Sequence, residues 1–144
     1  MKFLDANVFI YAYYKPKKQL TNKEKQMKEQ AKKIITDISQ GKEKALITVV
    51  HLAEIVNILK HGMPPKKLTE VIRGILMLEN IKVQSLTKEA YFVANELGDD
   101  LKLEANDALA IETMRSNNVT EIFSFDKDFD HIEGITRIPN SPKT

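Results

Sequence analysis

The sequence predicts an α/β protein, a three-layer α/β/α sandwich whose central sheet is mostly parallel. Short apolar stretches alternate along the chain with longer stretches in which apolar residues recur every three or four positions. The length of 144 residues fits one ordinary domain, and 42% hydrophobic with 29% charged residues is a globular balance. We therefore expect a single domain over residues 1–144, with its core at about 2–138 and a polar C-terminal tail.

The N-terminal half is expected to contribute two strands and four helices. The strands are predicted at 2–5 and 45–49, and the helices at 7–14, 20–40, 50–60 and from 64–65 onward. The longest helix has apolar residues at three- and four-residue spacing and ends before Gly41. The last of the four begins with a proline pair, which suits the first turn of a helix. Its apolar stripe consists of Leu68, Val71, Ile72, Ile75 and Leu76.

The C-terminal half is expected to contribute three strands and two helices. The strands are predicted at 81–86, 121–125 and 134–138, and the helices at 87–98 and 103–117. Strands that alternate with helices in this way pair in parallel, because each helix carries the chain back to the same end of the sheet.

The composition excludes several kinds of site. The chain has no Cys, so any metal must be held by oxygen or imidazole, and a disulfide framework is excluded. Charged residues interrupt every apolar run well before the roughly 20 residues that a membrane-spanning helix needs. The N-terminal MKFLDANVF lacks the features of a signal peptide. We expect a cytoplasmic protein that does not contact a membrane.

Lysines crowd one early stretch of the chain, although the net charge is only +2. They are Lys15, Lys17, Lys18, Lys23, Lys25, Lys28, Lys32 and Lys33. Such a run forms either a solvated helix face or a surface that contacts nucleic-acid phosphates, and the sequence leaves both interpretations open.

Two acids directly follow predicted strands, where parallel sheets bind their ligands. Asp5 closes the first strand, and Asp126 follows the fourth within the segment FDKDFD. Each also has an ordinary structural interpretation. Asp5 could be the N-cap of the next helix, and Asp126 could be a turn residue.

Two further acids lie on predicted helices. Asp107 shares a helical stripe with Leu103 and Ile111, on a face that should pack against the sheet. A carboxylate there costs several kcal/mol unless a cation or hydrogen bonds compensate for it. Glu54 lies away from the main apolar face of its helix, although Val50 and Ile58 flank it, and taken alone it is expected to point to solvent.

A cluster of these four acids would predict a divalent cation. Carboxylates brought close together repel one another, and a hard cation relieves that repulsion. An all-oxygen site suits Mg²⁺ or Mn²⁺, and such a site suits the hydrolysis of phosphate esters.

Four segments resemble the signature segments of PIN domains, in the same order and at similar separations. They are LDANVFIYA, HLAEIVNIL, NDALAIETM and SFDKDFDHIEGITRI. The chain is most similar to the VapC-type toxins of toxin–antitoxin pairs, and the resemblance runs from about residue 2 to about residue 138. It implies a PIN-like α/β/α fold, in agreement with the element pattern.

The resemblance also implies roles for the acids. Asp5 and Asp107 would be the principal metal ligands, and Glu54 would complete the cluster directly or through water. Asp126 would support a second metal position or orient water. Asp128 remains an alternative to Asp126, which we favour because of its spacing from the preceding hydroxyl residue.

Two polar residues would support these acids. By the resemblance, Asn7 would bond to Asp5 and orient it, and the hydroxyl of Ser124 would bond to a site carboxylate. Ala6 departs from the family, because many members have Ser or Thr there.

The implied function is that of a metal-dependent endoribonuclease with one or two Mg²⁺ or Mn²⁺ ions, the toxin of a VapBC-type pair. Alternatives are a PIN nuclease in RNA processing or DNA cleavage, and a PIN-like nucleic-acid-binding module with weak catalysis. Many such toxins are homodimers silenced by an antitoxin that inserts a segment into the acidic groove. We expect Phe9, Tyr13 and Tyr14 to be core residues, with a dimer contact as the other possibility.

Other phosphate-handling classes fit less well. A haloacid-dehalogenase-like phosphatase needs a second Asp two residues after the first, where this chain has Asn7. A response-regulator receiver needs an acidic pair after the first strand, whereas the pair Asp99 and Asp100 lies elsewhere. The five glycines are scattered and form no phosphate-binding loop.

Overall fold

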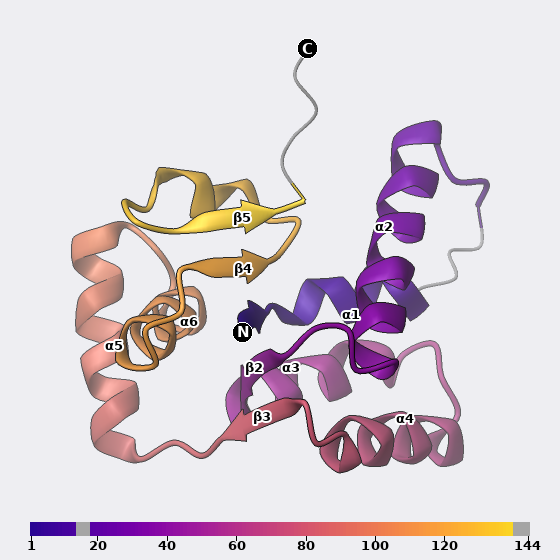
Figure 1. The fold of residues 1–144 in the computed structure, drawn as a ribbon, viewed down its shortest axis with the longest axis horizontal. Coiled ribbons are helices and arrows are strands. Elements are labelled where there is room, and N and C mark those ends of the chain that lie inside the picture. Colours follow the sequence, from indigo (N-terminus) through magenta and orange to yellow (C-terminus); the bar gives the residue numbers. More distant parts are fainter. Residues whose placement is uncertain (14–17, 140–144) are drawn as a thin grey trace.

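The fold is a five-stranded sheet between two layers of helices, in the strand order β3-β2-β1-β4-β5. It was obtained as a computed structural model, which describes residues 1–13 and 18–139. The elements are β1 (Lys2–Leu4), α1 (Ala6–Tyr13), α2 (Asn22–Ser39), β2 (Ala45–Thr48), α3 (Val49–Leu59), α4 (Pro65–Met77), β3 (Ile81–Gln84), α5 (Lys88–Leu101), α6 (Ala105–Ser116), β4 (Glu121–Phe123), the 3₁₀ helix η1 (Lys127–His131) and β5 (Thr136–Ile138). Figure 1 shows α5 and α6 on one side of the sheet and α1, α2 and α4 on the other.

All pairings between these strands are parallel, which confirms the predicted fold class. Phe3 of β1 lies opposite Leu46 of β2 and Ile122 of β4. Because successive strand residues point to opposite faces, this row packs against α6, while Leu4 and Ile47 pack against the helices of the other layer. The sheet therefore separates two apolar cores, and its strands are buried on both faces.

Helix ends differ from the sequence prediction by one to three residues. The second helix begins at Asn22, because Thr21 and Glu24 form a reciprocal capping box. The helix predicted at 87–98 continues to Leu101, and η1 was not predicted. Leu76 is 55% exposed, so its placement in the apolar stripe was wrong: α4 buries only a narrow face, through Leu68 and Ile75.

The α5–α6 hairpin positions the helix that carries Asp107. Lys102 ends α5 in the left-handed conformation, with φ of 59°, and Leu103 N–H donates to the Gly98 carbonyl at 2.9 Å. A Cβ at Gly98 would lie 2.6 Å from the Leu103 carbonyl oxygen and 3.3 Å from Ala108 Cβ. The two helices therefore approach this closely because residue 98 has no side chain.

Some sequence predictions concern residues outside the described ranges, namely Tyr14, Lys15, Lys17 and the tail beyond Pro139. Among the described residues, the search for a helix of sufficient length and apolarity to span a membrane finds none.

Candidate metal centre

Asp5 lies at the carboxyl end of β1 and is buried, with 7% of its surface exposed. The Ser124 hydroxyl donates to its Oδ2 at 2.6 Å, and a backbone hydrogen bond from Ala6 also acts to lower its pKa. Burial raises the pKa of Asp5 to about 6 despite the Ser124 hydrogen bond, and the charges of Glu54 and Asp126 add to the rise. Asp5 is thus buried, and the groups that shift its pKa include no positively charged side chain.

Ser124 connects the ends of β1 and β4. Its hydroxyl donates to the Asp5 carboxylate, a bond of the kind predicted, and its Oγ also accepts the backbone N–H of Asp126 at 3.0 Å. Asn7 contacts Asp5 only indirectly, through Ser124. Its Nδ2 donates to Ser124 Oγ at 3.5 Å and its Oδ1 accepts the Phe125 N–H at 3.3 Å, so the expected direct bond from Asn7 to Asp5 was wrong. The reason is the turn after β4, which brings Phe125 against the Asn7 amide.

Asp107 lies in the first turn of α6 and is partly buried. Burial raises its pKa to about 7, and the negative charges of Asp5 and Asp126, followed by those of Glu104 and Glu54, add to the rise. Each charged group that acts on Asp107 is an acid. The other three acids that the sequence singled out therefore lie near enough for their charges to act on Asp107, and Glu104 is a further one.

Asp126 and Asp128 both reach the cluster. Asp126 is the N-cap of η1 and accepts the Asp128 N–H at 2.9 Å, so it is a turn residue as well as a member of the cluster. One carboxylate oxygen each from Asp107, Asp126 and Asp128 lie within 4.8 Å of one another. Either acid after β4 can therefore share a cation with Asp107.

Glu54, in the middle of α3, faces the start of α6. The Asn106 Nδ2 donates to its Oε1, so its side chain is half-buried rather than pointing to solvent as its own helix suggested. Burial raises the pKa of Glu54, the Asn106 hydrogen bond opposes this rise, and the charge of Glu104 adds to it.

His51 is buried one turn before Glu54 on α3, with 1% exposure. Its Nε2 lies 3.0 Å from the Asn106 carbonyl oxygen and its Nδ1 lies 2.6 Å from Thr48 Oγ1. Since a carbonyl only accepts, Nε2 carries the proton and Nδ1 accepts the Thr48 hydroxyl. Burial lowers the pKa of His51 to about 4, which fits this neutral ring.

Sequence reasoning missed Asn106, Tyr91 and Glu104 as neighbours of the acids. Glu104 had a weak signal, because it belongs to the acid-rich stretch that leads to Asp107. Asn106 and Tyr91 had none, since their importance arises only from the packing of α5 on α6.

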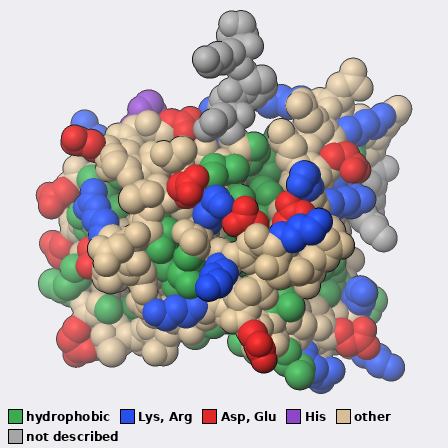
Figure 2. Space-filling view, viewed as in Figure 1, with side chains coloured by type: hydrophobic (Ala, Val, Ile, Leu, Met, Phe, Trp, Pro, Cys, Tyr) green, Lys and Arg blue, Asp and Glu red, His purple; other side chains and the backbone are tan. Residues whose placement is uncertain are grey.

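The early lysines have mixed roles. Lys28 donates to the Tyr11 and Ala12 carbonyls at the end of α1, and Lys33 pairs with Asp37 at 2.8 Å. Figure 2 shows positive and negative side chains intermixed over the surface around α2 rather than a continuous positive patch. Both observations favour the solvated-face interpretation for α2. A phosphate contact by Lys18, Lys23 or Lys25 stays a prediction.

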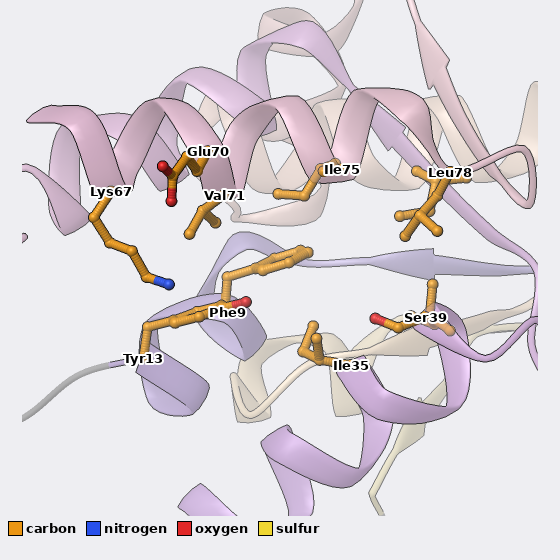
Figure 3. Close-up of a pocket in the computed structure, with 12 residues that line it drawn as sticks. Phe9, Tyr13, Ile35, Ser39, Lys67, Glu70, Val71, Ile75 and Leu78 are labelled. Atoms are coloured by element: carbon orange, nitrogen blue, oxygen red, sulfur yellow. The ribbon is translucent and has the colours of Figure 1, made fainter.

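Away from the acids, a hollow of about 340 Å³ lies between α4 on one side and α1 and α2 on the other. Figure 3 shows Val71 and Ile75 of α4 opposite Phe9 and Ile35, while Lys67 extends toward Tyr13. Phe9 is 2% exposed and belongs to the core, as expected. With a mostly apolar lining, this hollow lacks the groups for metal chemistry.

The donor set of the acid cluster fits a hard divalent cation. Its ligand atoms are carboxylate oxygens, and those of Asp107, Asp126 and Asp128 are close enough to share one ion, whereas Asp5 and Glu54 are not part of this trio. Burial, followed by the charges of neighbouring acids, raises the pKa of Asp5 and that of Asp107, and a bound cation would oppose both effects. Mg²⁺ and Mn²⁺ are the ions that such oxygen sites prefer.

Comparison with known proteins identifies the class. An α/β/α sandwich with acids at the carboxyl ends of its strands is an architecture suited to metal binding. The PIN domain family model matches residues 2–135 of this chain. The chain therefore belongs to the PIN domain family.

Three solved structures share the fold. A chain of a toxin–antitoxin complex from Klebsiella pneumoniae is 15% identical, with a TM-score of 0.64 and coverage of 94% of this chain and 96% of that chain. VapC20 of Mycobacterium tuberculosis, a toxin that cleaves the sarcin–ricin loop, is 16% identical, with a TM-score of 0.68 and coverage of 90% and 93%. A chain of VapBC2 from Rickettsia felis, bound to a DNA fragment from its promoter, is 15% identical, with a TM-score of 0.61 and coverage of 94% of this chain and 96% of that chain. The search of curated proteins finds no match.

Proposed function

We propose that this protein is a metal-dependent endoribonuclease and the toxin of a VapBC-type toxin–antitoxin pair, acting in the cytoplasm as a single domain. The observation that carries the proposal is the set of acids around Asp107, whose mutual repulsion and burial raise its pKa to about 7. An acid cluster without a structural cation costs stability, and a metal-dependent reaction gives a reason to keep it.

Asp5 and Asp107 would hold the first Mg²⁺ or Mn²⁺ ion, with Glu54 completing the cluster. Asp126, or Asp128 beside it, would contribute to this ion or to a second one. When bound, a divalent ion neutralises charge at the scissile phosphate and acidifies the attacking water. One ion or two remain the alternatives within the proposal.

The other side chains would hold these acids in place. The Ser124 hydroxyl fixes one oxygen of Asp5 and would so orient the carboxylate for a cation. Asn7 acts through Ser124, since its amide donates to the same hydroxyl oxygen. The hydroxyl also accepts the Asp126 N–H, so the acids after β1 and β4 are tied to one atom.

An antitoxin partner is part of the proposal. Its support is that two of the three solved structures described above are toxin–antitoxin complexes of the same fold. We expect a small gene beside this one, and co-expression with its product should yield a complex that purifies together and has lower nuclease activity than the free chain. A free chain whose activity is unaffected by that product would contradict this part of the proposal.

The test of the activity is cleavage of RNA by the purified protein with Mg²⁺, with Mn²⁺ and with EDTA. Cleavage should require metal, and Asp5→Asn should abolish it. Asp99→Asn is the matched control, because it removes an exposed acid from α5 and should leave the rate unchanged. Undiminished cleavage by metal-stripped protein would overturn the proposal. A parallel assay on single-stranded DNA separates a ribonuclease from a less selective nuclease.

A further inference from the structure

A chain of side-chain hydrogen bonds joins three helices beside the acid cluster. The Tyr91 hydroxyl on α5 donates to Asn106 Oδ1 on α6 at 2.5 Å, and Asn106 Nδ2 donates to Glu54 Oε1 on α3. The acids themselves belong to the site already described. Tyr91 and Asn106 do not, and the proposed chemistry leaves their role open.

The two bonds fix the orientation of the Asn106 amide. A carboxylate only accepts hydrogen bonds, so the amide must present its NH₂ group to Glu54. The amide oxygen then faces Tyr91, whose hydroxyl is a donor of the matching kind. A flipped amide would place oxygen against the Glu54 carboxylate and NH₂ against the hydroxyl, and would lose the bond to Glu54. Because the Tyr91 hydroxyl could also accept from a flipped amide, the Glu54 carboxylate sets the amide orientation, and Tyr91 adds a second bond that holds the amide in place.

The backbone of Asn106 is anchored as well. His51 Nε2–H donates to the Asn106 carbonyl, and the Thr48 hydroxyl holds the other ring nitrogen of His51. Thr48 also caps α3 by accepting the His51 N–H at 3.2 Å. Glu54 lies one turn further along α3 than His51. The first half of α3 and the first turn of α6 are therefore joined at two points, one through the backbone of Asn106 and one through its side chain.

This arrangement places one residue between two acids. Asn106 directly precedes Asp107 in α6 and directly contacts Glu54 on α3. A residue so placed sets the position of the Glu54 carboxylate relative to the Asp107 carboxylate. Polar groups that hold metal-binding side chains typically contribute tenfold to a hundredfold in metal affinity or activity.

We propose that Asn106 is a positioning residue that holds Glu54 toward the metal centre, and that the Tyr91 hydroxyl holds the Asn106 amide in the place this requires. The inference rests on the proposed function, because it assigns Glu54 to that centre. It predicts that both residues act through Glu54.

The experiment is a double-mutant cycle read by two independent measurements, the dissociation constant of Mn²⁺ and the rate of RNA cleavage. Asn106→Ala should weaken Mn²⁺ binding and slow cleavage by about tenfold. Tyr91→Phe keeps the ring and removes only the hydroxyl, and should cost about fivefold. In a Glu54→Ala background, neither substitution should have a further effect. Tyr91→Phe keeps the test informative if Asn106→Ala folds poorly.

Asn117→Ala is the matched control. Asn117 is also an Asn of the α6 region, but at the opposite end, where its amide donates to Gln84 Oε1 and the Thr113 carbonyl, both at 2.8 Å. Its loss should lower the melting temperature. It should leave the dissociation constant of Mn²⁺ unchanged.

The outcomes separate the inference from the proposed function. Costs of Asn106→Ala and Tyr91→Phe that persist in the Glu54→Ala background would overturn the inference, because they would mark a general structural role. If the parent binds Mn²⁺ but cleaves no RNA, the proposed function fails while the binding cycle still decides the role of Asn106. A parent that neither binds Mn²⁺ nor cleaves RNA would overturn both.

Discussion

Asp107 and Asp130 are two carboxylates that the same fold treats in opposite ways. Asp107 is partly buried among acids, and burial together with their charges raises its pKa to about 7. Asp130 is more exposed and accepts two hydrogen bonds from the buried Arg137, one from Nε to Oδ1 at 2.8 Å and one from Nη2 to Oδ2 at 3.1 Å. These bonds lower the pKa of Asp130. A structural acid here has its cation within the chain, whereas under the proposed function the acids of the candidate site would take their cation from solution.

The comparison has a consequence for stability. Substitutions in the scaffold around the acids should destabilise the protein, because they remove contacts that the native state uses. Substitution of an acid in the cluster should instead stabilise the metal-free protein, because it relieves repulsion and desolvation.

The largest effect is expected for Gly98→Ala in the α5–α6 hairpin. The new Cβ would lie 2.6 Å from the Leu103 carbonyl oxygen, so the backbone before Asp107 must shift. Chemical denaturation should give a loss of about 3 kcal/mol in the free energy of unfolding. Gly74→Ala is the control, since nothing lies within 4 Å of its Cβ, and it should stabilise α4 by about 0.5 to 1 kcal/mol. Equal effects of the two substitutions would refute the close approach.

Arg137→Met should have the next largest effect. The substitution keeps an apolar stem but removes the bonds to Asp130 and to the Ser124 and Pro139 carbonyls, at 3.2 and 3.1 Å. Because the Asp130 side chain is 43% exposed, water replaces part of its lost hydrogen bonding, and we expect the free energy of unfolding to fall by about 2 kcal/mol. A more stable Arg137→Met protein would show that the ion pair does not serve the scaffold.

Asp130→Asn should cost less than the loss of its partner, about 0.5 kcal/mol near neutral pH, because the side chain is largely solvated. The sign of its pH dependence is the sharper prediction. A lowered pKa in the folded state contributes stability that is present above the ordinary Asp pKa and is lost as pH falls. The difference from the parent should therefore shrink on acidification, and a difference that grows would contradict the pairing.

The sequence carried enough information for the layers and for the acids. Helical spacing over 20–40 and short apolar strands such as 45–49 predicted their elements to within a few residues. Asp107 stood out because a carboxylate on an apolar helix face needs an explanation, and it is indeed partly buried. These features are local, so periodicity detects them.

Side-chain contacts between helices could not be predicted from the sequence. Asn106 is an ordinary polar residue in the sequence, and its bonds to Tyr91 and Glu54 depend on the hairpin geometry at Gly98 and on the rotation of α3. The Asn7 contact was misassigned for the same reason. The turn after β4 decides that its amide meets Ser124 instead of Asp5.

The pH dependence of the parent alone mixes groups that act in opposite directions, because the pKa values of Asp5, Glu54 and Asp107 are raised and that of His51 is lowered. Asp107 keeps a proton in the folded state between its ordinary pKa of 3.8 and about 7, so the free energy of unfolding falls as pH rises through that window. His51 acts in the opposite direction between about 4 and its ordinary pKa of 6.5, because its folded-state pKa is lowered. Subtracting the profile of Asp107→Asn from that of the parent isolates the acid.

The most direct test of a site built for metal is the free energy of unfolding of the parent and of Asp107→Asn, with EDTA and with Mg²⁺. Without metal at about pH 7.5, the variant should be more stable by about 1 kcal/mol, and this advantage should shrink toward pH 4. Mg²⁺ should stabilise the parent more than the variant, because it binds the folded site. A metal-free Asp107→Asn protein that is less stable than its parent would contradict the account, since it would make Asp107 a structural acid.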